Sequence, residues 1–89
     1  MRVADRIESK LREALAPTEI EIHDDSHLHE GHSGWRVGGE THFRVRIVSS
    51  QFAGHGRVAR QRMVYDAIAN ELTDRVHALQ VTAQTPEET

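Results

Sequence analysis

The chain has 89 residues, of which 28% are charged, with a formal net charge of -3 and no cysteine. This length allows one domain, whose single core buries roughly 60–65% of the unfolded surface. The absence of cysteine excludes disulfides, a thiolate nucleophile and thiolate metal ligands. The negative charge argues against a protein that binds nucleic acid mainly by neutralising phosphates over a broad surface.

The sequence also argues against a membrane protein and an enzyme. No apolar segment approaches the ~20 residues needed to span a bilayer, and the first residues lack the apolar core of a signal peptide. No nucleophile, base and orienting group can be placed together. We therefore expect a cytoplasmic protein that is not an enzyme and does not contact a membrane.

The first two predicted elements are an amphipathic helix over Val3–Leu15 and a strand over residues 18–24. In the helix, apolar residues recur at intervals of three and four, while charged residues such as Lys10 are expected to face solvent. Pro17 favours the end of this helix. The strand alternates apolar and polar residues. The apolar positions are Val3, Ile7, Leu11, Ala14, Leu15, Ile20 and Ile22.

Residues 25–39 form a histidine-rich segment with no period of either kind, and its glycines predict a loop. Five of the seven histidines lie between His23 and His42, these two included. A polar loop dense in imidazole is costly to bury, so we expect it to present ligands.

The second half of the chain predicts a strand, a helix and a third strand. Residues 40–50 alternate as a strand, with Phe43, Val45 and Ile47 on one side and His42 and Val48 on the other. Residues 58–72 return to the helical period, and residues 76–83 alternate again before a short tail over residues 84–89. The expected apolar stripe of this helix is Met63, Val64, Ala67, Ile68, Ala69 and Leu72.

The order helix, strand, strand, helix, strand predicts one α+β domain over residues 1–89. A three-stranded sheet with both helices on one face buries every apolar stripe in a two-layer sandwich. The first two strands are expected to be antiparallel. The third is expected to run parallel to one of them after a right-handed crossover, which makes the sheet mixed.

Five short motifs, in their order and spacing, resemble the BolA family. They are Thr41-His42-Phe43-Arg44-Val45, Ser49-Ser50-Gln51-Phe52-Ala53-Gly54, Arg60-Gln61-Arg62-Met63-Val64-Tyr65, Glu71-Leu72 and Val76-His77-Ala78-Leu79. The resemblance runs from about residue 7 to residue 85. It implies a fold related to the class II KH arrangement.

The resemblance also implies a function, in which the protein partners a monothiol glutaredoxin and shares a [2Fe-2S] cluster for cluster trafficking or iron regulation. One ligand would be His77 and the other His29, with His27 and His32 less favoured. Because this chain has no cysteine, a glutaredoxin cysteine and a glutathione thiolate would complete the ligand set. Two imidazoles in place of thiolates raise the reduction potential and make the site sensitive to protonation near neutral pH.

Some residues depart from the family pattern or support the site only indirectly. Gln61 stands where a histidine is frequent, and the loop has no cysteine, which indicates the histidine subtype. Asp25 or Glu30 is a candidate to orient a ligand imidazole. His23, His42 and His55 are interpreted as surface or supporting residues.

Two other functions stay open at this point. Arg57, Arg60 and Arg62, near the start of the second helix, could meet DNA phosphates in a transcriptional regulator. His27, His29 and His32 alone could chelate zinc or copper, although no cysteine or paired helix fixes a tetrahedron. The sequence also leaves open whether the free protein forms a homodimer.

Overall fold

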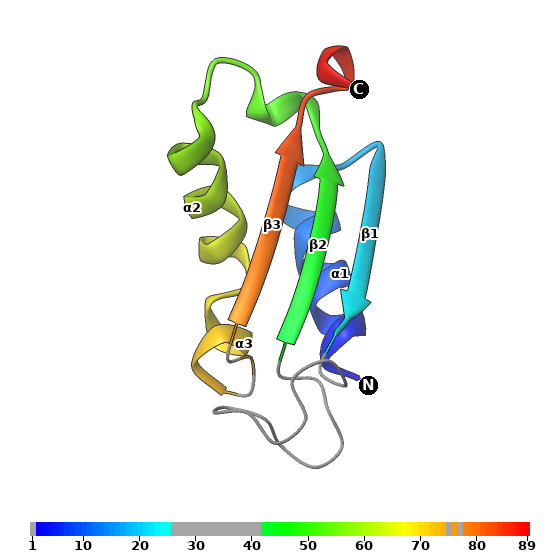
Figure 1. Ribbon diagram of the computed structural model, residues 1–89, viewed down its shortest axis with the longest axis vertical. Helices are drawn as coiled ribbons and strands as arrows, with labels where there is room; N and C mark the ends of the chain where they lie inside the picture. Colours follow the sequence, from blue (N-terminus) through cyan, green and yellow to red (C-terminus); the bar gives the residue numbers. More distant parts are fainter. Residues whose placement is uncertain (1, 26–41, 75, 77) are drawn as a thin grey trace.

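The computed structural model describes residues 2–25, 42–74, 76 and 78–89. Its elements are α1 (Val3–Leu15), β1 (Glu19–Asp24), β2 (His42–Val48), the 3-10 turn η2 (Ser50–Phe52), α2 (Arg57–Ala67), α3 (Ala69–Asp74), β3 (Ala78–Gln84) and the 3-10 turn η3 (Pro86–Glu88). In the sheet order β1-β2-β3, β1 and β2 are antiparallel and β2 and β3 are parallel. Figure 1 shows the helices on one face of the sheet. The predicted two-layer α+β sandwich with a mixed sheet is confirmed.

The core fills the space between the helices and the central strand β2. The α1 stripe of Val3, Ile7, Leu11 and Leu15 is buried as its helical period predicts. Ala14, expected in the same stripe, is exposed. The other apolar members of the core are Phe43, Val45, Ile47, Phe52, Val64, Ile68 and Val76.

The predicted single helix over residues 58–72 is two helices in the structure. Ile68, between α2 and α3, leaves the helical region with φ -119° and ψ 30°, and its N–H bonds to the carbonyl of Tyr65. Ile68 is fully buried, whereas Ala69, expected in the apolar stripe, is exposed. The periodic pattern missed this break, because apolar spacing reports which residues are buried and not whether the helical backbone is continuous through them.

The strands differ from the prediction mainly at their ends. His42 and Val48 were expected on the less buried side of β2, but both are buried. Val76 is also buried, and β3 begins only at Ala78. At the other end of the molecule the fully buried Ser49 Oγ donates to the Leu15 carbonyl at 2.6 Å and accepts from the Gln51 N–H at 3.1 Å. This hydroxyl joins the end of α1 to the β2–η2 connection.

Within the described ranges, no helix combines the length and the apolar character required to cross a bilayer.

Candidate functional site

The two segments that carry the predicted ligands join the described fold at one end of the sheet. β1 ends at Asp24, which pairs with Phe43, and the first residue of β2, His42, pairs with Ala78 at the start of β3. Asp25 extends this end, because its N–H donates to the His42 carbonyl at 2.8 Å. Figure 1 shows this end at the bottom of the sheet.

The predicted ligands His27, His29, His32 and His77 lie outside the described residues, as does Glu30. The choice among these histidines therefore stays a prediction. Among residues 2–25, 42–74, 76 and 78–89, no three His, Asp or Glu side chains gather in a group that could hold a metal ion. A metal at this end of the sheet would depend on the remaining residues or on a partner.

A hollow of about 210 Å³ lies beside these strand ends, lined by Asp25, His42, Phe43, Ala78, Leu79 and Gln80. Its polar wall includes one carboxylate and one imidazole. The Asp25 carboxylate accepts a hydrogen bond from Arg44 Nε at 3.0 Å, and His42 is 6% exposed. The sequence analysis interpreted His42 as a surface or a supporting residue. The structure excludes the surface position, because His42 is buried.

A partly buried ion pair joins α1 to α3, the helix that leads into β3. Lys10 Nζ donates to both carboxylate oxygens of Glu71, at 2.9 and 2.8 Å. The Glu71 side chain is 3% exposed and that of Lys10 is 36% exposed. The Lys10 side chain is partly exposed, as its place on the charged face predicts, but its ammonium group is paired with Glu71, which the sequence analysis did not foresee. One signal was available in the sequence: Glu71 continues the buried spacing of Val64 and Ile68.

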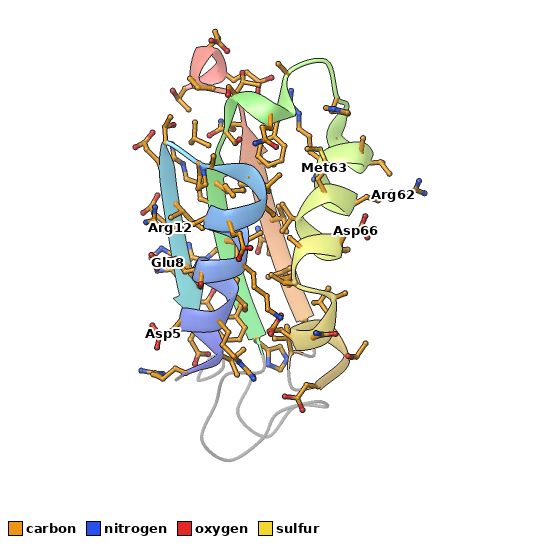
Figure 2. All side chains as sticks on the ribbon, turned by 180° about the vertical axis from the view of Figure 1, so that it is seen from behind. Asp5, Glu8, Arg12, Arg62, Met63 and Asp66 are labelled. Carbon is orange, nitrogen blue, oxygen red and sulfur yellow. The ribbon has the colours of Figure 1, made fainter. Side chains whose placement is uncertain are left out.

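The opposite end of the sheet carries a second and larger hollow of about 480 Å³. It lies between the start of α2 and the end of β3, and is lined by His55, Gly56, Arg57, Arg60, Gln61, Val81, Thr82, Ala83 and Glu88. Of the three arginines predicted to bind DNA, it therefore brings Arg57 and Arg60 together. Arg62 lies on the outer side of α2 and points away from the helix layer, near Asp66 (Figure 2).

The Arg60 guanidinium is occupied by hydrogen bonds within the protein. It donates to Glu88 at 2.6 and 3.2 Å, to the Ala83 carbonyl at 3.2 Å and to the His55 carbonyl at 2.7 Å. The Arg60 side chain is only 14% exposed, and its charge lies 6.0 Å from the centre of the Phe52 ring. Arg60 thereby fastens the segment after β3, predicted as a plain tail, to the start of α2.

The Arg60–Glu88 contact makes a testable prediction about acid. The hydrogen bond from Arg60, together with one from the Thr85 N–H, lowers the pKa of Glu88 from 4.5 to about 2. Because the folded pKa is depressed, this stabilisation is complete above pH 4.5 and is lost as the pH falls toward 2. Titration of the Glu88 carboxyl by NMR is expected to show the low midpoint.

The control for this titration separates the direct contact from general positive charge. Arg60→Ala is expected to raise the Glu88 midpoint toward 4.5, whereas Arg57→Ala is expected to leave it in place. Equal midpoints in the wild type and Arg60→Ala would contradict the assignment.

Comparison with known proteins places the fold in one class of small α+β domain. Residues 11–88 match the family model described as "BolA-like protein". The chain is 47% identical over 89 residues to the "Uncharacterized protein in cobS 5'region" of Sinorhizobium sp, covering 99% of this chain and 96% of the relative. The chain belongs to the BolA family.

Two further relatives differ in length and in name. The solved BolA domain of SufE1 from Arabidopsis thaliana has a TM-score of 0.87 and 44% identity, with 97% of this chain and 94% of that chain covered. The chain spans only 24% of the complete "SufE-like protein 1, chloroplastic/mitochondrial". It is 40% identical to the "DNA-binding transcriptional regulator BolA" of Escherichia coli over 88 residues, covering 99% of this chain and 80% of the relative.

Proposed function

We propose that this chain is a non-enzymatic partner of a monothiol glutaredoxin and co-ligates a [2Fe-2S] cluster through His77 and His29, in cluster trafficking or iron regulation in the cytoplasm. The observation that carries the proposal is the register of the sheet. Asp25 leads into the histidine-rich segment and Ala78 follows His77, and both line the same hollow. In the sequence, His29 is four residues after Asp25 and His77 directly precedes Ala78, so each candidate ligand is close in sequence to a residue that lines this hollow.

The ligand count requires a partner. A [2Fe-2S] cluster takes four protein or thiol ligands, commonly thiolates, and this chain has no cysteine. A glutaredoxin cysteine and a glutathione thiolate would bind one iron and two imidazoles the other. When bound, such a cluster supplies one-electron chemistry and a transferable iron–sulfur unit.

The described residues at the site suit this role. The Asp25 carboxylate accepts a hydrogen bond from Arg44 Nε at 3.0 Å, and a carboxylate is one of the groups that orient imidazole ligands through their second ring nitrogen. His42 contributes a further buried imidazole to the same hollow. His27 and His32 remain the alternatives to His29, because each is within three residues of it in the sequence.

The test is co-expression of the chain with a monothiol glutaredoxin, followed by purification without oxygen. We expect a coloured complex of one copy of each protein, with visible absorption and circular dichroism that require glutathione. A mixture that stays colourless and elutes as two separate proteins would overturn the proposal.

A second candidate function, DNA binding, is favoured by the larger hollow, which lies at the start of α2. Its wall presents exposed Arg57 and His55, and the relative from Escherichia coli carries a DNA-binding name. Arg60 is a poor candidate for phosphate contact, because Glu88 already neutralises it.

DNA mobility shifts at several salt concentrations test this second function. Each phosphate contact contributes about 0.9 to the slope of log affinity against log salt. Arg57→Ala is therefore expected to reduce the slope by about 1, while Arg62→Ala, on the same helix but not among the residues that line the hollow, serves as the charge control. Equal slopes for the wild type and Arg57→Ala would exclude a phosphate contact by Arg57.

A further inference from the structure

We infer that the Lys10–Glu71 ion pair is a positioning device for the start of β3, and hence for the ligand that the proposed function assigns to His77. This inference rests on the proposed function. It adds two positioning residues, one on α1 and one on α3, to a site for which sequence analysis named only histidines.

The first step is the geometry of the pair. Lys10 Nζ contacts both oxygens of the Glu71 carboxylate, at 2.9 and 2.8 Å, so the pair sets a short distance between α1 and α3 at this point. The two residues are 61 positions apart in the sequence. Since Glu71 is 3% exposed, water competes little for this carboxylate.

The second step links Glu71 to the strand. The backbone carbonyl of Glu71 accepts a hydrogen bond from the Val76 N–H at 3.1 Å, a bond over five residues of the kind that closes helix C-termini. Val76 is 6% exposed and directly precedes His77. Glu71 is therefore anchored to α1 through its side chain and to the approach of β3 through its backbone.

The third step concerns where this approach leads. Two residues after Val76, Ala78 pairs with His42 and lines the hollow of the candidate site. Figure 1 shows α3 beside the start of β3, at the end of the sheet where β1 terminates. Any rotation of α3 would move Val76 and therefore the direction in which the chain enters β3.

An ion pair has one property here that an apolar contact lacks. Replacing a buried ion pair by apolar residues of similar volume is often neutral for stability, so stability alone does not explain the pair. The hydrogen-bonded pair requires a short nitrogen–oxygen distance and so restrains the position of α3 against α1 at Glu71, whereas apolar side chains would tolerate several positions. We therefore assign the pair to positioning.

The same two helices provide a matched control. Arg6 Nη2 lies 3.6 Å from Asp74 Oδ2, and the Asp74 side chain is 67% exposed. This pair also joins α1 to α3, but its contact is in solvent, where ion pairs contribute little. Asp74→Asn should therefore remove a pair between the same helices without altering the buried contact.

The experiment compares the wild type, Lys10→Met/Glu71→Leu and Asp74→Asn. Amide hydrogen exchange in the free protein is expected to show Val76 exchanging ~10-fold faster in the double variant, with Val45 and Ile47 unchanged. In the complex with glutaredoxin, the cluster is expected to pass to a chelator several-fold faster, with an altered circular dichroism spectrum. Asp74→Asn should behave as the wild type in both measurements.

The outcomes separate the inference from the proposed function. Wild-type exchange at Val76 and a wild-type cluster in the double variant would overturn the positioning role while leaving the cluster intact. If the wild-type mixture forms no cluster, the proposed function is overturned. The claim that the Lys10–Glu71 pair positions His77 as a ligand is then overturned with it. If the double variant does not fold, Glu71→Gln keeps the side-chain volume and is subject to the same two criteria.

Discussion

Replacing Lys10 with methionine is expected to lower the free energy of unfolding by about 3 kcal/mol, the lower end of the ~3–5 kcal/mol that breaking a buried ion pair costs. The reason is that Glu71, at 3% exposure, would keep a charge without a partner in the helix layer. We take the lower end because Lys10 is 36% exposed. Urea unfolding measures this change, and for a domain of this size the melting temperature falls by about 4–8 °C per kcal/mol.

Two comparisons give the Lys10 prediction its specificity. Lys10→Met/Glu71→Leu is expected to recover most of the lost stability, because both charges are removed and the volume is kept. Glu8→Ala breaks the exposed Glu8–Arg12 pair of the same helix, with a nitrogen–oxygen distance of 2.9 Å, at a cost of about 0.3–0.5 kcal/mol. A Lys10→Met variant no less stable than Glu8→Ala would contradict the burial of the pair.

If the proposed cluster is shared with glutaredoxin, His77→Ala is expected to abolish it while the free protein stays folded. Losing even a hydrogen bond to a ligand costs about 10–100-fold in metal affinity, so removal of a ligand itself should cost at least ~100-fold. The measurement is the visible absorption and circular dichroism of the mixture with glutaredoxin. His29→Ala should have a milder effect wherever His27 or His32 can replace it.

The matched control for this prediction is His55→Ala. His55 is exposed and lines the larger hollow at the opposite end of the sheet. Its replacement therefore removes an imidazole that is remote from the candidate site. An unchanged spectrum in His77→Ala would remove His77 from the ligand set. Equal losses in His77→Ala and His55→Ala would instead indicate a general effect of histidine replacement.

Local patterns were sufficient for the parts of the fold that one element decides. The α1 stripe apart from Ala14, and the alternating Phe43, Val45 and Ile47, are buried as predicted. These patterns succeed because a helix or strand with one apolar face must turn that face to the core. The order of elements then left few ways to close the two layers.

The functional site could be predicted only in part. The family motifs named His77 and the histidine-rich segment, while the structure supplied the surroundings: Asp25 paired with Arg44, and His42 buried in the same hollow. The three arginines predicted to bind DNA do not act together, since Arg60 is held by Glu88 and Arg62 is not among the residues that line the hollow at the start of α2. Sequence spacing placed these arginines close together along the chain but carried no information about their partners.

By itself, then, the sequence determined the family, the two-layer architecture and the absence of thiolate ligands, all of which follow from residue types, motifs and periods. Only the tertiary structure decided that the second helix breaks at Ile68 and that Lys10 reaches Glu71, 61 positions away. The tertiary structure likewise decided that the Arg60 guanidinium donates a hydrogen bond to the Glu88 carboxylate. The physical reason is that a periodic pattern reports which face of an element avoids water, whereas an ion pair between layers exists only once packing has set their distance and orientation.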